Sequence, residues 1–354
     1  MKNIECYLPD INFKIIVPNE FYEEAKEKIS QSVIEYSKNI ERYITLEYIV
    51  DSEYFERLKE EIENTDGNIH NSFKNQTHKE VCIRKKSCFL VNTKEYICIK
   101  ENDLNYKILV AENNLTSLNW IVRIIRELYL REKEDKEYAF MHGTGLVVNG
   151  KGILILGNSG SGKTTLAVKL LEAKGKKEFL SNDRIFINAE RIMDYFPQAV
   201  TYAMGTVKNN KHLDNYFRSN KILEKNKNVN YETVSYDFDC NTPLTDVAKV
   251  FENTQMVARA ELNTIVMPKF IKEMDKVEMV ELSNEEKRKI LESTDFTPDD
   301  VETYRTPWLR KRYLKRNELL EIRKDLIETI LKDIDIKAIN YGAKTKTEDI
   351  IEIL

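Results

Sequence analysis

Residues 151 to 165 decide the fold, and they read Lys151-Gly152-Ile153-Leu154-Ile155-Leu156-Gly157-Asn158-Ser159-Gly160-Ser161-Gly162-Lys163-Thr164-Thr165. The apolar run from Ile153 to Leu156 predicts a strand, and Asn149-Gly150 before it predicts a tight turn from a preceding strand. Leucines spaced along residues 165–174 predict an amphipathic helix that ends at Gly175. The sequence therefore predicts a hairpin, a glycine-rich loop and a helix in direct succession.

The glycine-rich loop matches the pattern G-x-x-x-x-G-K-[ST] in full, between a strand and a helix as phosphate-binding loops require. Small residues let backbone N–H groups turn inward around phosphates, and the helix that follows directs its positive dipole end at the same anions. Lys163 is expected to reach the β- and γ-phosphates, and Thr164 to ligate Mg²⁺. An ordinary glycine-rich turn is the alternative. We predict a nucleoside triphosphate site made by Gly157, Asn158, Ser159, Gly160, Ser161, Gly162, Lys163, Thr164 and Thr165.

Asp183 is the best candidate for a second Mg²⁺ ligand, because it ends an apolar stretch about 20 residues after Lys163. In α/β folds of this kind, ligands bind beside the carboxyl ends of strands. A turn aspartate that only caps the strand is the alternative. Its neighbour Asn182 is an amide and has no basic group.

Composition limits the other functions. Glycine is scarce, and seven of the 11 glycines lie between Gly143 and Gly162, so special backbone geometry is concentrated there. The formal charge of −4 indicates no overall basic field for nucleic acid. The sequence shows no signal peptide and no membrane-length apolar run. Five cysteines without C-x-x-C spacing are expected to be reduced thiols, so we predict a cytoplasmic protein.

The chain is predicted to contain two domains. Residues 1–134 alternate short strands with amphipathic helices, one of them over residues 20–42, and form a smaller α+β domain. The charged residues 131–137 are expected to be solvated and to mark the boundary. Residues 135–354 form an α/β domain with a mixed sheet that carries the glycine-rich loop after the hairpin.

Other nucleotide-binding classes lack support in this sequence. Transport ATPases carry a downstream L-S-G-G-Q signature, and GTPases carry an N-K-x-D motif that recognises the base; neither is present. Nucleoside-monophosphate kinases usually place the loop near residue 10, whereas here it begins at Gly157.

The sequence from Met141 to Gly152, the loop, and Phe179-Leu180-Ser181-Asn182-Asp183-Arg184-Ile185 together resemble the catalytic core of HPr kinase/phosphorylase. The resemblance implies a fold related to phosphoenolpyruvate carboxykinase and an ATP-dependent kinase that phosphorylates a serine or threonine hydroxyl of a peptide or small protein. Two tail segments resemble divergent relatives, including kinases of lasso-peptide precursors: Thr297-Pro298-Asp299-Asp300 and Pro307-Trp308-Leu309. The first 130 residues carry no such resemblance.

Carried over by position, the resemblance implies that the loop binds ATP and Mg²⁺, that Asp183 acts with Thr164 on the metal, and that His142 lies near the catalytic acid. As an alternative, His142 is only a strand-edge residue bonded to a carbonyl. The family's first aspartate is replaced by Asn182, and its E-x-R-G segment by Tyr202-Ala203-Met204-Gly205. The reverse phosphorylase reaction and HPr itself as acceptor are therefore not part of the expectation.

Two other functions stay open: a kinase of a free hydroxyl metabolite, and a nucleotide-binding regulatory module that has lost transfer. Residues 204–208 are an acceptor-side loop or a plain surface loop. The basic residues 310–316 are a solvated helix start or a docking site for an acidic peptide. Trp308 is expected to be a packing anchor, with a base-stacking platform as the alternative. The oligomeric state is open, and so is a catalytic role for Asp237, Asp239 and Asp246.

Overall fold

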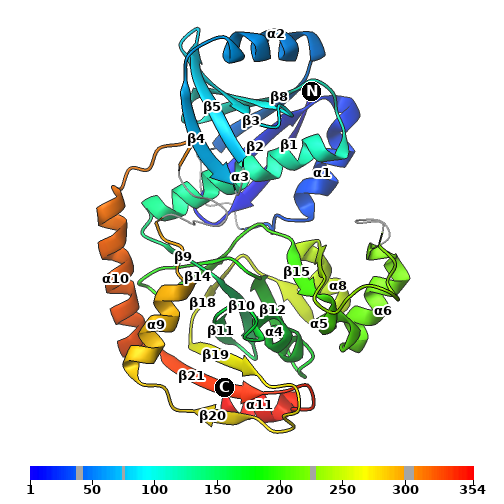
Figure 1. Ribbon diagram of the computed structural model, residues 1–354, viewed down its shortest axis with the longest axis vertical. Helices are drawn as coiled ribbons and strands as arrows, with labels where there is room; N and C mark the ends of the chain where they lie inside the picture. Colours follow the sequence, from blue (N-terminus) through cyan, green and yellow to red (C-terminus); the bar gives the residue numbers. More distant parts are fainter. Residues whose placement is uncertain (37–42, 74–75, 224–228, 299–306) are drawn as a thin grey trace. The chain divides into compact units, whose positions relative to one another are not determined.

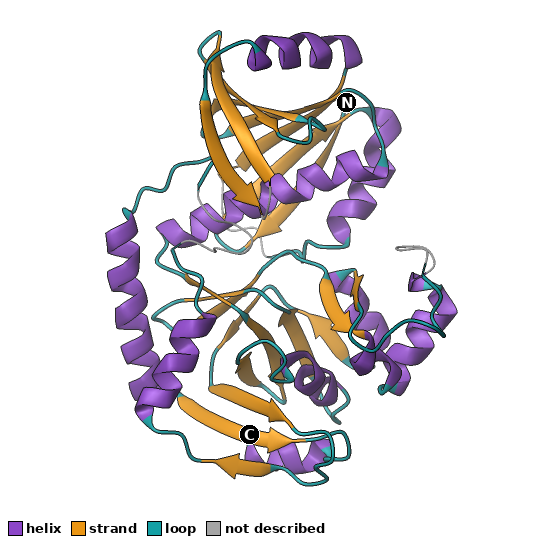
Figure 2. Cartoon of the chain, in the orientation of Figure 1, coloured by secondary structure: helices purple, strands orange, loops and turns teal. Residues whose placement is uncertain are grey.

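The computed structural model describes residues 1–36, 43–73, 76–223, 229–298 and 307–354, and the chain is a mixed α/β protein with several sheets (Figures 1 and 2). It divides into two compact units. The first contains Met1–Glu137 and Phe296–Leu320, and the second contains Tyr138–Asp295 and Glu321–Leu354. Asp299 and Asp300 of the tail resemblance lie outside the described residues.

The first unit is built on an eight-stranded sheet. In spatial order its strands are β1 (Lys2–Leu8), β2 (Ile11–Val17), β3 (Tyr43–Val50), β8 (Asn105–Val110), β7 (Ile97–Asn102), β6 (Lys86–Val91), β5 (Gln76–Ile83) and β4 (Asn68–Phe73). Strands β2, β3 and β8 are parallel, and the remaining pairs are antiparallel. The helices are η1 (Asn19–Phe21), α1 (Tyr22–Ser30), α2 (Ser52–Glu63) and α3 (Leu115–Asp135).

Helix α2 covers one face of this sheet. The Asp51 side chain accepts a hydrogen bond from the Tyr54 N–H and caps the helix start. Phe55, Leu58 and Ile62 then form one buried cluster with alternate residues of the strands, among them Ile97, Ile99 and Leu109. Because side chains alternate along a strand, the buried Phe89, Cys98 and Ile108 belong to the opposite face.

Three expectations for this unit are corrected. Helix α1 ends at Ser30, well short of the expected residue 42, and residues 37–42 of that expected helix lie outside the described residues. Most of the charged residues after Leu130 are not solvated, because α3 continues to Asp135 and buries Arg131, Lys133 and Glu134, whereas Lys136 and Glu137 are exposed as expected. The single boundary expected after residue 134 lies after Glu137, and residues 296–320 return to the first unit.

The second unit is built on a seven-stranded mixed sheet. In spatial order its strands are β17 (Thr254–Met256), β12 (Lys177–Ser181), β10 (Gly143–Val148), β11 (Lys151–Leu156), β19 (Thr264–Phe270), β21 (Asp335–Tyr341) and β20 (Glu278–Val280). Strands β11, β19 and β21 are parallel to one another, and β10 is antiparallel to both of its neighbours. The hairpin expected around the Asn149-Gly150 turn is confirmed as β10 and β11.

Smaller sheets and helices complete the second unit. Strands β18 (Arg259–Glu261), β14 (Ile192–Tyr195), β13 (Ile185–Ile187) and β9 (Ala139–Met141) form one sheet, and β15 (Val200–Ala203) pairs with β16 (Asp239–Thr242). The helical segments are α4 (Lys163–Leu171), α5 (Met204–Lys208), α6 (Lys211–Asn220), η2 (Leu244–Asp246), α8 (Val247–Val250), α9 (Asn284–Thr294), α10 (Arg316–Asp333) and α11 (Thr347–Ile353). Helix α10 begins within residues assigned to the first unit.

Helix α4 lies against β10 and β11 (Figure 1) and buries Leu166, Leu170 and Leu171. It begins at Lys163, two residues before the expected start. Across the described ranges, we find no helix with both the length and the apolar character needed to cross a membrane.

Candidate functional site

One edge of the seven-stranded sheet gathers the predicted site residues of the second unit. Strand β11 ends at Leu156, which pairs with Gly143, the first residue of antiparallel β10. Strand β12 is antiparallel to β10 and therefore runs in the same direction as β11. The residues that precede β10 and those that follow β11 and β12 consequently lie at this edge. They are His142, the glycine loop (residues 157–164) and the turn of residues 182–184.

The glycine loop needs glycine at defined positions. Gly160 and Gly162 have φ angles of 77° and 93°, in the left-handed region that glycine adopts without strain. A Cβ on Gly162 would lie 2.7 Å from both the Phe270 Cβ and the Tyr341 hydroxyl oxygen. A Cβ on Gly160 would meet nothing within 4 Å. The loop is therefore closely packed at Gly162 and open at Gly160.

Two parallel strands hold the loop from its inner side. The Tyr341 hydroxyl, at the end of β21, donates a 2.6 Å hydrogen bond to the Gly162 carbonyl. The Phe270 N–H, at the end of β19, donates a 3.0 Å bond to the Ser161 carbonyl. Because β19 and β21 are parallel to β11, their carboxyl ends reach the same edge and fix the start of α4.

Helix α9 supports the same edge from its C-terminal end. The Ser293 hydroxyl donates to the side-chain oxygen of Asn158 at 3.2 Å. The carbonyl of the next residue, Thr294, accepts a 2.6 Å bond from the His142 N–H. One helix end thus contacts both the glycine loop and the residue that precedes β10.

Lys163 points back over the glycine loop. Its ammonium donates to the carbonyls of Gly157 at 2.7 Å and Asn158 at 3.1 Å, and the residue is only 7% exposed. Burial lowers the pKa of Lys163, the charge of Arg184 lowers it further, and Asp183 opposes both effects. A buried ammonium held by two neutral carbonyls is a strong donor for an anion that reaches this loop.

Within the described residues, the side-chain hydrogen bond that the structure shows for the Thr164 hydroxyl is to Asn182 and not to a carboxylate. The Asn182 side-chain oxygen accepts a 2.8 Å bond from the Thr144 hydroxyl and lies 3.5 Å from that of Thr164. The Asn182 amide donates to the Thr201 carbonyl at 3.3 Å. With both ends of its amide engaged, Asn182 ties β10 and β15 to the start of α4.

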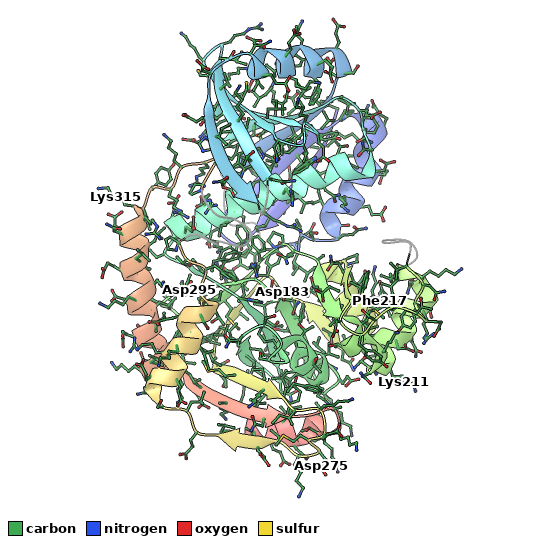
Figure 3. All side chains as sticks on the ribbon, in the orientation of Figure 1. Asp183, Lys211, Phe217, Asp275, Asp295 and Lys315 are labelled. Carbon is green, nitrogen blue, oxygen red and sulfur yellow. The ribbon has the colours of Figure 1, made fainter. Side chains whose placement is uncertain are left out.

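Asp183 occupies a left-handed backbone conformation, with φ at 66°, in the turn that follows β12 (Figure 3). Burial raises the pKa of Asp183, whereas the charges of Arg184 and Lys163 and a hydrogen bond from Thr201 oppose that rise. The pKa effects between Asp183 and Lys163 place this carboxyl within the electrostatic field of the loop lysine.

The His142 imidazole is uncharged near neutral pH. Burial lowers its pKa to about 3, and the charges of Lys163 and Arg184 contribute to this shift. Burial and the two nearby cations disfavour the protonated imidazole, so His142 is a weak base in this structure. All three residues expected to be catalytic, His142, Lys163 and Asp183, therefore belong to one electrostatic cluster.

Some of the other residues singled out in the sequence contact the start of α4 or act on Asp183, and others make contacts elsewhere. Thr165 shares a 2.9 Å hydrogen bond with Thr206 in α5, so residues 204–208 form a short helix beside the start of α4. Asp239, at the start of β16, raises the pKa of Asp183 slightly through its charge. Asp246 accepts a hydrogen bond from Tyr216 and pairs with Lys249 at 2.6 Å, which assigns its carboxylate to a local contact.

Sequence reasoning missed three side chains that hold the site: Thr144, Ser293 and Tyr341. Thr144 lies two residues after His142, and this closeness in sequence is a signal that could have indicated it. Ser293 and Tyr341 lie 135 and 179 residues beyond the loop residues that they contact, and no local pattern connects them to the loop.

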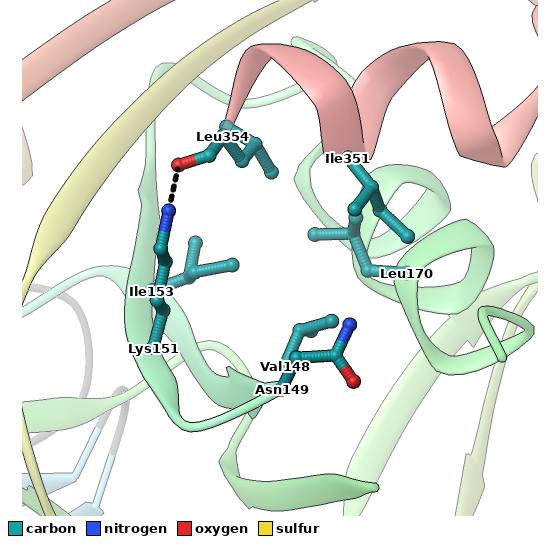
Figure 4. A pocket seen from close by; sticks show the side chains of 7 residues that line it. All are labelled: Val148, Asn149, Lys151, Ile153, Leu170, Ile351 and Leu354. Atoms are coloured by element: carbon teal, nitrogen blue, oxygen red, sulfur yellow. Dashed lines mark hydrogen bonds between the residues drawn. The ribbon is translucent and has the colours of Figure 1, made fainter. Parts of the chain in front are cut away.

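A separate pocket lies at the opposite edge of the same sheet (Figure 4). It has a volume of about 150 Å³, and its walls come from the β10–β11 turn, α4 and α11. Lys151, the first residue of β11, donates to the Leu354 carbonyl at 3.3 Å across its mouth. Since the glycine loop follows the last residue of β11, this pocket does not belong to the candidate site.

Among the side chains that the structure describes, no three histidines, cysteines or acidic residues gather in a way that could hold a metal ion. Comparison with known proteins adds no assignment. No protein-family model matches the sequence, and no curated protein matches it.

Proposed function

We propose that the chain is an ATP-dependent kinase with an HPr-kinase-like α/β fold, and that residues 157–165 bind the nucleotide. One observation carries the proposal: the full G-x-x-x-x-G-K-[ST] sequence forms the loop between β11 and α4, with Lys163 folded over it. Helix α4 begins at Lys163, so the first N–H groups of the helix have no intrahelical acceptor and face the loop end.

The residues present fit a bound triphosphate. The Ser161 hydroxyl is buried, and it has no hydrogen-bond partner within the described residues. Gly160 leaves open space where any side chain would project. A polyphosphate would accept bonds from such donors, and Lys163 would exchange its two carbonyl partners for phosphate oxygens.

Mg²⁺ also fits the available donors. In nucleotide sites this ion needs only one or two protein ligands besides phosphates and water, so the lack of a three-ligand cluster in the described chain does not oppose it. The Thr164 hydroxyl and the Asp183 carboxylate would hold it. When bound, Mg²⁺ neutralises negative charge on the phosphates and thereby supports transfer.

The proposed reaction transfers the γ-phosphoryl group to a serine or threonine hydroxyl of a peptide or small protein. The hydroxyl oxygen forms a bond to phosphorus as the bond to the oxygen that bridges the β- and γ-phosphates breaks. Lys163 stabilises the charge that develops on the phosphoryl oxygens. The hydroxyl proton passes to the Asp183 carboxylate or, because a loose transition state needs little base assistance, to solvent. The lowered pKa of His142 makes its imidazole a weak proton acceptor. A free hydroxyl metabolite could accept the same group.

Asn182 favours a second candidate function, a nucleotide-binding regulatory module that does not transfer phosphate. It is buried, and its amide is engaged by Thr144 and by the Thr201 carbonyl, so it supplies structure and no base. The two functions share the nucleotide site and differ only in the step that follows binding.

The test begins with calorimetric binding of Mg-ATP to the full chain. Lys163→Ala should weaken binding by about 10- to 100-fold, since a hydrogen bond to a charged group contributes about 1.5–3 kcal/mol. Lys174→Ala is the matched control, because Lys174 is exposed just beyond α4. Binding that Lys163→Ala leaves unchanged would overturn the assigned site.

Transfer is then measured with γ-labelled ATP and two acceptor sets, a serine- and threonine-containing peptide library and a panel of hydroxyl metabolites. Label on peptides supports the kinase proposal, and label on a metabolite alone replaces its acceptor class. Tight binding without transfer to either set supports the regulatory module.

A further inference from the structure

Arg184 is a charged residue at this edge of the sheet, and the loop pattern does not include it. It lies in the turn after β12, is only 7% exposed, and donates a 2.9 Å hydrogen bond from its guanidinium to the Asp183 carbonyl. The Ser181 hydroxyl donates to the Arg184 carbonyl and fixes the turn from the other side. The backbone at Arg184 is therefore held in place at the sheet edge that carries the glycine loop.

The charge of Arg184 reaches every titratable group of the cluster. It lowers the pKa of His142 and of Lys163, and it is the largest charge effect on the pKa of Asp183. The cluster thus combines the cations Lys163 and Arg184 with the Asp183 carboxylate and a neutral imidazole, and the charge of Asp239 also acts on it. A guanidinium and an ammonium beside a glycine-rich loop are donors suited to an incoming anion.

The position of Arg184 along the chain indicates which part of an anion it would meet. Asn182, two residues earlier, lies 3.5 Å from the Thr164 hydroxyl. In loops of this sequence that hydroxyl faces the metal-binding end of the triphosphate, where the β- and γ-phosphates lie. A guanidinium is planar and presents paired N–H donors, which suits the two oxygens of a terminal phosphate.

We propose that Arg184 is a second phosphate-binding cation, which contacts the terminal phosphate of the nucleotide and makes the site prefer a triphosphate over a diphosphate. The proposal rests on the proposed nucleotide site and extends it to the recognition of the γ-phosphate. Lys163 then contacts both the triphosphate and the diphosphate nucleotide, whereas Arg184 contacts only the triphosphate.

The test compares Mg-ATP and Mg-ADP binding by calorimetry for wild type, Arg184→Gln and Arg184→Lys. Arg184→Gln should weaken ATP binding by about 10-fold and change ADP binding by less than about 2-fold, because only ATP carries the contacted group. Arg184→Lys should keep part of the ATP preference, since it retains the charge and loses the paired donors. Arg191→Gln is the matched control, an exposed arginine of the same unit that pairs with Glu261 at 3.4 Å.

Each result separates the two proposals. Equal loss of ATP and ADP affinity, or no loss of either, overturns the role of Arg184 while leaving the nucleotide site in place. A wild-type chain that binds neither nucleotide overturns both. Thermal melting of each variant identifies misfolding, and if Arg184→Gln does not fold, an ATP-to-ADP preference in Arg184→Lys equal to that of wild type overturns the proposal.

Discussion

At the scale of single residues, His142 shows how the cluster controls its own charge. Burial, Lys163 and Arg184 together hold the pKa of its imidazole at about 3, against 6.5 for an ordinary histidine. Below pH 6.5, His142 is therefore protonated in the unfolded chain, whereas it stays neutral in the folded chain down to about pH 3. This residue therefore leaves the free energy of unfolding unchanged above pH 6.5 and lowers it as the pH falls from 6.5 toward 3.

This argument predicts that His142 makes the folded chain sensitive to acid. Between pH 6.5 and pH 4.5, wild type should lose about 1.4 kcal/mol per pH unit through this residue alone. His142→Asn should remove that part of the slope, whereas His212→Asn, at an exposed position of α6, should not. Denaturant unfolding at several pH values measures the slopes, and parallel curves for wild type and His142→Asn would contradict the prediction.

At the scale of elements, the glycine loop depends on strands that are distant in sequence. The ends of β19 and β21 hold the Ser161 and Gly162 carbonyls, and they occupy the space that a Cβ on Gly162 would need. Gly160, two residues earlier, has a similar left-handed φ and open surroundings. Alanine at Gly160 would therefore introduce backbone strain alone, whereas alanine at Gly162 would add a steric clash.

The expected result is that Gly162→Ala destabilises the chain more than Gly160→Ala does. Gly160→Ala should cost about 1–2 kcal/mol of unfolding free energy, the strain of a left-handed alanine. Gly162→Ala should cost about 1–3 kcal/mol more, because its Cβ would displace Phe270 and Tyr341. Urea unfolding of the two variants and wild type measures both costs. Equal costs would show that the strand ends do not pack on the loop as described.

Local pattern predicted the elements that surround the loop, and it failed where distant contacts decide. The β10–β11 hairpin and α4 were predicted because turn residues and leucine spacing are local signals. Strand β19 was not predicted, although it lies beside β11, because Pro268 opposes a central strand. Its pairing with β11 covers only Thr264–Val266, so the proline lies beyond that ladder and is tolerated.

The candidate site divides in the same way. The loop sequence predicted residues 157–165 as site residues, and strand spacing predicted Asp183, because both signals lie within about 30 residues. Tyr341 and Ser293 reach the loop through the sheet topology and the end of α9, which no residue pattern encodes. The buried state of Arg184 could not be predicted either, since arginine is usually exposed.

At the scale of the whole chain, the first unit includes residues 296–320, which come after most of the second unit in the sequence. Trp308 stacks on His78 with ring centroids 3.8 Å apart, which confirms it as a packing anchor. Arg310 pairs with Glu132 at 2.7 Å and with Asp135 at 3.1 Å, so it is neither a solvated helix start nor a docking site. These partners are separated by more than 170 residues, and sequence reading assigned the segment to the wrong domain for that reason.

Arg312 tests how this returning segment is held. Its guanidinium bonds both oxygens of Glu134, at 2.6 and 2.9 Å, and both side chains are less than 10% exposed. Glu134 also accepts from the fully buried Arg131 at 2.8 Å, so it keeps one partner when Arg312 is removed. We therefore expect Arg312→Met to cost about 2 kcal/mol, less than the 3–5 kcal/mol of a buried charge left alone.

The loss should be local to the first unit and insensitive to salt, because a buried pair is poorly screened. Hydrogen exchange followed by mass spectrometry should show faster exchange over residues 307–316 in Arg312→Met, at both 0.05 and 0.5 M NaCl. Exchange of the glycine loop should stay at the wild-type rate, since it belongs to the other unit. Lys311→Met is the matched control, because Lys311 is the exposed neighbour of Arg312 and forms no such pair with the residues that the structure describes. Equal exchange in the two variants would show that the Arg312–Glu134 pair does not hold the segment.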